Sequence, residues 1–162
     1  MSELQQRHVN SATEIPCMLL PMVNHSLILP TTTIAEMSPM LPLEDLPDLP
    51  DWVVGLYNWR NMKIPVISIE SINSGGKPPI NPQGRIAVLN STGTLDGLPF
   101  IGIHTQGIPR MTRVSENDIQ DNPNLPKREY DALSVKVGME EFYLPDVAKL
   151  EMATIHLDVL AI

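Results

Sequence analysis

The sequence contains very little cysteine, because Cys17 is the only one among 162 residues. A single cysteine cannot form an internal disulfide. A chain of this length can bury roughly 70% of its extended surface in one domain without disulfides or metal. The sequence therefore predicts a domain whose stability requires no cofactor.

Long apolar runs are also missing. No stretch approaches the ~20 apolar residues that are needed to cross a bilayer. No N-terminal segment combines a basic start, an apolar core and a cleavage site. We therefore expect a cytoplasmic protein that does not insert directly into a membrane.

Positive charge is scarce, with 11 basic against 19 acidic residues and a formal net charge of −8. Such a chain repels phosphate backbones and anionic lipid headgroups. This balance argues against nucleic acid as a partner. Proteins and small molecules remain as the expected partners.

Catalytic and metal-binding motifs are absent from the sequence. There is no G-x-S-x-G elbow, no dinucleotide fingerprint and no C-x-x-C or HExxH pair. Cys17 lies beside an apolar run without an evident base, so it is expected to be a small core residue. The histidines are widely spaced and are expected to be surface or hydrogen-bonded residues: His8, His25, His104 and His156. We therefore predict no enzyme activity, no catalytic residue and no metal ligand.

The residues that are present predict an all-β fold. Sixteen prolines and nine glycines separate apolar runs of strand length. Residues 53–59 and 64–69 read as a hairpin with a tight turn at Arg60-Asn61, since Asn tolerates a positive φ. Residues 18–23 and 26–29 read as a first hairpin, and Pro21 suggests that its first arm is an edge strand.

Further strands are expected in the second half of the chain, over 85–89, 98–104, 111–114, 133–137 and 141–144. Asp146 fits the N-cap of a short helix, whereas the alternation from Ile155 to Val159 also fits a strand. Residues 1–16 read as a flexible N-terminal arm and residues 17–162 as a single domain of two halves. The Gly- and Pro-rich segment 73–83 is the expected join between those halves. Short strands with frequent turns indicate a barrel or a sandwich.

One group of residues resembles a known family. Gly55, Asn58 and Arg60, followed by Pro65-Val66-Ile67, resemble the G-x-x-N-x-R-G and P-V-I/V motifs of CheW-like coupling domains from bacterial chemosensory arrays. Residues 34–37 are similar to the V-x-E-I/V segment of that family, and later strands follow in its order. The resemblance implies two small five-stranded SH3-like β-barrels packed together, with one or two short helices.

The resemblance also implies a function. A stand-alone CheW-like protein is a non-catalytic adaptor that binds the regulatory domain of a CheA-type histidine kinase and the tips of methyl-accepting chemoreceptors. Other CheW-like proteins are further candidate partners. Two positions depart from the motif, since Asn61 replaces its final Gly and Trp59 replaces an aliphatic residue. These departures, together with the proline-rich first half of the chain, suggest an accessory coupler of the type that controls type IV pili and twitching motility.

Six residues are the candidate partner-binding site: Arg60, Asn58, Trp59, Asn61, Glu36 and Tyr57. Two interpretations of Arg60 stay open, a partner contact at the hairpin tip or a side chain folded back onto backbone carbonyls. Tyr57 and Trp59 are either interface anchors or ordinary barrel packing. The alternative function is a small-molecule-binding β-barrel, a sensor or a minor enzyme, with a cleft between its halves.

Overall fold

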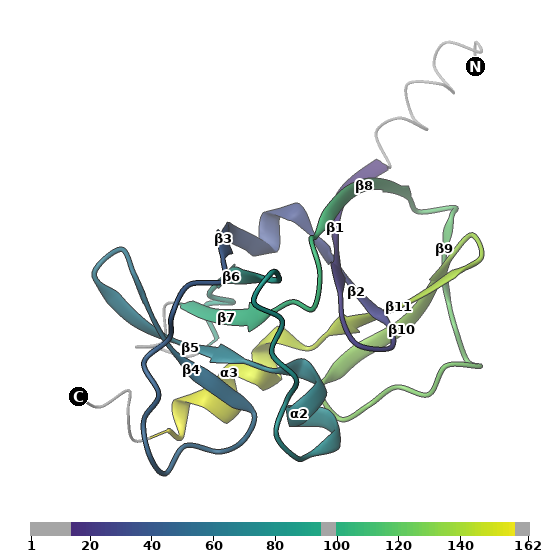
Figure 1. Ribbon diagram of the computed structural model, residues 1–162. Helices are drawn as coiled ribbons and strands as arrows, with labels where there is room; N and C mark the ends of the chain where they lie inside the picture. The colour runs from purple at the N-terminus through teal and green to yellow at the C-terminus, as the bar shows by residue number, and fades with distance from the viewer. Residues whose placement is uncertain (1–13, 95–99, 158–162) are drawn as a thin grey trace, which may run out of the picture.

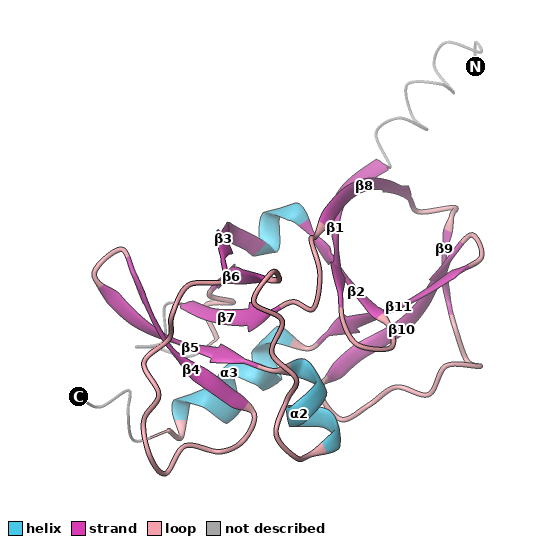
Figure 2. Ribbon diagram, viewed as in Figure 1, coloured by secondary structure: helices cyan, strands magenta, loops and turns pink. Residues whose placement is uncertain are grey.

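Strands in two sheets are the main regular structure of the computed structural model, which describes residues 14–94 and 100–157. Short helices lie beside these sheets (Figure 1, Figure 2). The all-β class with short helices is therefore confirmed. Residues 1–13, most of the predicted N-terminal arm, lie outside the described part of the chain, and β1 already begins at Glu14.

The first sheet has six strands in the order β8-β1-β2-β11-β10-β9. Their bounds are β8 Arg110–Ser115, β1 Glu14–Pro21, β2 Ser26–Pro30, β11 Glu140–Pro145, β10 Asp131–Val137 and β9 Ile119–Asp121. The edge strands β8 and β9 follow each other in the chain and are separated by residues 116–118 only. The sheet therefore bends into the ring seen in Figure 1. It has one strand more than expected, because the three-residue β9 lacks a recognisable apolar pattern.

Pro21 does not mark an edge strand, so that prediction was wrong. β1 lies between β2 and β8, pairing with β2 from Cys17 to Pro21 and with β8 from Glu14 to Leu19. Pro21 thus lies beyond the end of β8, and Pro16 lies before the start of the β2 pairing. Each proline has a neighbouring strand on one side only, which is where a missing N–H is tolerated.

The second sheet has five strands in the order β3-β6-β7-β5-β4. Their bounds are β3 Ile34–Pro39, β6 Arg85–Asn90, β7 Phe100–His104, β5 Met62–Ile67 and β4 Val53–Trp59. The sheet curls so that its two edge strands meet, since Trp59 of β4 donates a hydrogen bond to Glu36 of β3. This barrel has the five strands that the sequence led us to expect. Residues 98–99 of the strand predicted over 98–104 lie outside the described chain.

The chain crosses between the two barrels twice, through the 3-10 helix η1 (Thr31–Thr33) and through residues 105–109. Residues 75–84 instead connect α2 (Ile69–Ser74), which follows β5, to β6, and both of these strands belong to the second sheet. The predicted join at 73–83 was therefore wrong. Glycine and proline there mark an exposed loop within one barrel, which is an equally common use of these residues.

Apolar side chains form three clusters. One fills the first barrel around Cys17, Ile28 and Phe142, and another fills the second around Trp59, Val66 and Ile86. The largest lies between the barrels and joins residues of both sheets: Leu20, Leu27, Leu29, Ile67, Ile69, Ala87, Leu89, Ile101, Ile103, Tyr143 and Leu150. The two barrels thus share one continuous apolar contact.

Two short α-helices lie in the part of the chain that the structure describes. Ser68 caps α2, because its hydroxyl accepts a hydrogen bond from the Ser71 N–H at 3.2 Å. This helix was not predicted, since Ile69 continues the apolar run of β5 in the sequence. Asp146 caps α3 (Val147–Ile155) and accepts from the Lys149 N–H at 3.1 Å, which confirms the predicted helix start. The segment is helical through Ile155, and Val159 lies outside the described residues.

Candidate functional site

The hairpin of β4 and β5 carries the candidate site at its tip. Trp59 pairs with Met62, so the turn consists of Arg60 and Asn61 alone. Both residues have positive φ, +48° and +64°. Two consecutive positive φ values are the geometry of a type I′ turn, whose twist matches that of the flanking strands. The predicted turn at Arg60-Asn61 is confirmed.

Glu36 connects the hairpin tip to β3. Its carboxylate accepts hydrogen bonds from the Trp59 Nε1–H at 2.6 Å and from the Ser38 hydroxyl at 3.0 Å. The same carboxylate lies 3.6 Å from Nη2 of Arg60. The guanidinium of Arg60 also stacks over the Trp59 ring, 4.5 Å from its centre. Arg60 is therefore held by two neighbours on its own barrel.

The pKa of Glu36 is lowered from its ordinary value. The hydrogen bond from Trp59 is the largest cause, followed by the bond from Ser38, and the charge of Arg60 adds to them. Each of these interactions favours the ionised carboxylate. Glu36 is thus a stable negative charge that orients an adjacent positive one.

Four of the six predicted residues are accessible and form what we call the hairpin-tip site: Glu36, Asn58, Arg60 and Asn61. The side chain of Arg60 is 66% exposed and that of Glu36 is 42% exposed. Arg60 folds back as one interpretation expected, but onto a carboxylate and a ring. Among the described residues, its guanidinium has no hydrogen bond to a backbone carbonyl. It remains open to a partner.

Trp59 and Tyr57 are not surface anchors. Trp59 is 3% exposed and meets Phe100 edge-to-face at 4.7 Å, and Tyr57 is 8% exposed in the same cluster. Their shared strand face points into the second barrel, because alternate residues of a strand point to the same side. The interpretation of ordinary barrel packing is the correct one. Trp59 contributes to the site only through its N–H and its ring face.

Gly55 is required by a close approach of the chain. A Cβ added there would lie 2.7 Å from Cβ of Leu43 and 3.0 Å from the carbonyl oxygen of Glu44. The loop can approach because Glu44 and Leu56 exchange backbone hydrogen bonds of 2.9 Å. Glu44 then forms an ion pair of 3.0 Å with Lys63. The motif glycine therefore places an acidic loop beside the hairpin.

Three residues near the site were not among the predicted ones: Ser38, Lys63 and Phe100. Ser38 could have been found, because it is two residues after Glu36 and so shares its strand face. Lys63 could also have been found, since it is opposite Asn58 in a two-residue hairpin. Phe100 comes from a distant strand, and no local pattern places it against Trp59.

Outside the hairpin-tip site, the described part of the chain offers few groups that could bind a metal ion or react. Residues 14–94 and 100–157 contain no group of three or more His, Cys, Asp or Glu side chains that could hold a metal ion. Cys17 is buried in the first barrel, and burial raises the pKa of its thiol, as expected for a core residue. No helix described here is long and apolar enough to span a membrane.

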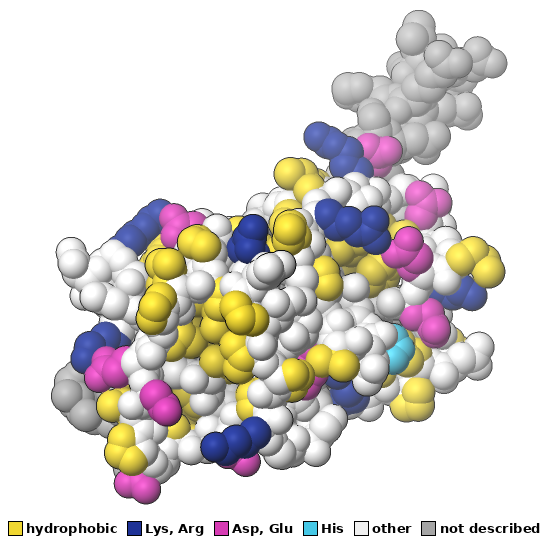
Figure 3. All heavy atoms as spheres, viewed as in Figure 1, with side chains coloured by type: hydrophobic (Ala, Val, Ile, Leu, Met, Phe, Trp, Pro, Cys, Tyr) yellow, Lys and Arg dark blue, Asp and Glu magenta, His cyan; other side chains and the backbone are white. Residues whose placement is uncertain are grey.

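Two packed β-barrels, one of which carries the exposed and charged hairpin tip, define a class of small all-β domains. Basic and acidic side chains both lie on the face of the molecule shown in Figure 3. The model of the CheW-like domain family matches residues 16–151. The chain therefore belongs to the CheW-like domain family. A similar solved structure is the scaffolding protein TtCheW from Thermoanaerobacter tengcongensis, with a TM-score of 0.67 and 16% identity over 81% of this chain and 83% of that one. No curated protein matches the sequence significantly.

Proposed function

We propose that this protein is a non-catalytic adaptor of bacterial chemosensory signalling, located in the cytoplasm. It couples chemoreceptors to a CheA-type histidine kinase through protein–protein contacts. Membership of the CheW-like family supports this role. The single observation that carries the site is an exposed arginine, Arg60, which is held by Glu36 and Trp59 at the tip of the β4–β5 hairpin.

The hairpin-tip site has the properties of a contact that is ordered before binding. An arginine that is already stacked on a ring and paired with a carboxylate loses less side-chain freedom on binding than a free one. Its planar group retains N–H donors for a second carboxylate, and such a fork is stronger than a neutral hydrogen bond. A partner with an acidic surface residue therefore fits this site best.

The type of chemosensory system is a finer proposal. The chain carries Trp59 and Asn61 where the family motif has an aliphatic residue and glycine. Trp59 supports Arg60 directly through its ring and its bond to Glu36, which an aliphatic residue cannot do. We propose that these changes adapt the tip to a distinct receptor or kinase, as in an accessory coupler of a pilus-controlling system.

Binding of the purified chain to both partners from its own organism tests the proposal. The partners are the regulatory domain of the CheA-type kinase and the cytoplasmic fragment of a chemoreceptor. We expect saturable one-to-one binding to each partner by biolayer interferometry. Failure to bind either partner at any attainable concentration would rule out the adaptor role.

A further inference from the structure

A pocket lies where the two barrels meet, away from the hairpin-tip site. It has a volume of about 410 Å³, within the range of about 300–1,000 Å³ that is common for small-ligand sites. Its walls come from the turn between β1 and β2, from α2, from the loop before β6, from the loop before β10, and from β11. We call it the junction pocket, and it is lined by Met22, Val23, Asn24, His25, Glu70, Ser74, Pro79, Arg128 and Tyr143.

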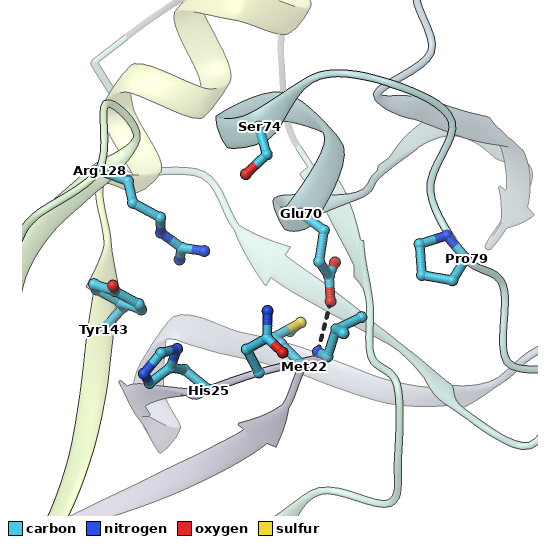
Figure 4. A pocket seen from close by; sticks show the side chains of 9 residues that line it. Met22, His25, Glu70, Ser74, Pro79, Arg128 and Tyr143 are labelled. Carbon is cyan, nitrogen blue, oxygen red and sulfur yellow. Dashed lines mark hydrogen bonds between the residues drawn. The ribbon is translucent and has the colours of Figure 1, made fainter.

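The negative side of the junction pocket is Glu70 of α2. Its Oε1 accepts a hydrogen bond of 3.0 Å from the Val23 N–H, and its Oε2 accepts one of 3.4 Å from the Ser68 hydroxyl. These bonds fix the carboxylate in the pocket wall (Figure 4). No lysine or arginine of the described chain forms an ion pair with Glu70, so its charge is available to a cationic group.

The positive side is Arg128. Its Nε and Nη2 donate to the buried Asp131 carboxylate at 2.8 and 3.1 Å, and its guanidinium lies over the Tyr143 ring at 3.9 Å. This pairing fixes one edge of the guanidinium and leaves Nη1 for other acceptors. In Figure 4 the guanidinium points into the pocket, toward the side on which Glu70 lies.

We propose that the junction pocket binds a small zwitterion of the amino acid or short peptide class. The ligand ammonium group pairs with Glu70, and its carboxylate accepts hydrogen bonds from Arg128. The stem packs against Met22 and Pro79. This binding site is additional to the adaptor role and does not depend on it.

A zwitterion satisfies this pocket better than an anion or a cation alone. The charge of Arg128 is already offset by Asp131, so a simple anion gains little net attraction and meets repulsion from Glu70. A simple cation is attracted by Glu70 but offers no acceptor to Nη1 of Arg128, which has no hydrogen-bond partner in the described chain. A ligand with both charges pairs with each side, and fixed opposite charges of this kind determine the orientation of a bound ligand.

Calorimetric titration of the full chain with a length series identifies the ligand class. The probes are glycine, β-alanine, γ-aminobutyrate and the dipeptide Ala-Ala, and the optimum among them distinguishes a free amino acid from a peptide. N-acetylglycine and glycinamide each lack one charge. We expect at least one zwitterion to bind, and each singly blocked form to bind at least about tenfold more weakly, as expected for the loss of one charged hydrogen bond.

Two variants test the location of the site. Glu70→Gln removes the charge but keeps an oxygen for the Val23 N–H, and it should weaken binding about tenfold or more. Ser74→Tyr places bulk in the pocket from an exposed helix position and should abolish binding. Glu44→Gln is the matched control on the remote loop and should bind normally. The proposal is overturned if no zwitterion binds at millimolar concentration, if the blocked forms bind equally well, or if a folded Glu70→Gln binds like the original chain.

Discussion

Reversing the charge of Arg60 separates a contact role from a structural one. The ion pair with Glu36 spans 3.6 Å between side chains that are 66% and 42% exposed, and exposed pairs contribute about 0 to 1 kcal/mol. Stacking of an exposed cation on Trp59 contributes about 0.5 to 1 kcal/mol. Arg60→Glu should therefore cost about 1 kcal/mol of stability, which lowers the Tm of a domain of this size by about 2 to 4 °C.

The same change should affect binding much more. Loss of a desolvated charge pair at an interface costs about 2 to 5 kcal/mol, or roughly 30-fold to several thousand-fold in affinity. The assay is affinity for the kinase regulatory domain and for the receptor fragment, with Tm measured on the same samples. Arg110→Glu is the matched control, because Arg110 is 69% exposed and forms an ion pair of 3.5 Å with Glu140 in the other barrel.

Two results would refute this reasoning. A folded Arg60→Glu variant that binds both partners normally would remove Arg60 from the site while leaving the fold unaffected. A fall in Tm of ten degrees or more, with binding reduced only in proportion to the folded fraction, would show that Arg60 is chiefly structural.

Three further predictions concern the fold. Gly55→Ala should lower stability by about 1 to 3 kcal/mol, because the new Cβ overlaps Leu43; an unchanged Tm would refute this. Burial lowers the pKa of His104 below its ordinary value of 6.5. As the pH falls, the unfolded chain therefore takes up a proton at this histidine before the folded chain does. The free energy of unfolding should fall as the pH drops from about 6.5 toward the lower folded-state pKa. Urea unfolding at several pH values measures this slope, which His104→Gln should flatten; an equal slope in both proteins would contradict it. Limited proteolysis should cut the exposed loop at Gly75-Gly76 and leave the rest folded, whereas persistent resistance would show that the loop is packed.

Local sequence patterns were sufficient to predict the hairpins. Asn61 indicated a tight turn, and the apolar runs on both sides of Asn24-His25 indicated the first hairpin. Pairing between distant strands had no such signal. The parallel contacts of β5 with β7 and of β11 with β2 depend on the global fold, so the assignment of strands to barrels, and with it the join at 73–83, could not be derived locally.

The candidate site was predictable to the same degree. The exposure of Arg60 followed from its place in a hairpin turn, because no neighbouring strand pairs with a residue at that position. The inward orientation of Tyr57 and Trp59 did not follow, since alternation identifies two faces but not which one is buried. The junction pocket was invisible in the sequence, because Glu70 and Arg128 are brought together only by the packing of the two barrels.

Control of kinase activity in a reconstituted system tests the adaptor role most directly. The kinase, membrane-bound receptors and this chain are combined, and the rate of kinase autophosphorylation is followed with and without a receptor ligand. An adaptor should make kinase activity depend on receptor ligand, and Arg60→Glu should abolish that dependence while Arg110→Glu preserves it. A kinase whose activity is the same with and without this chain, although all three proteins are folded and present in excess, would contradict the proposed function.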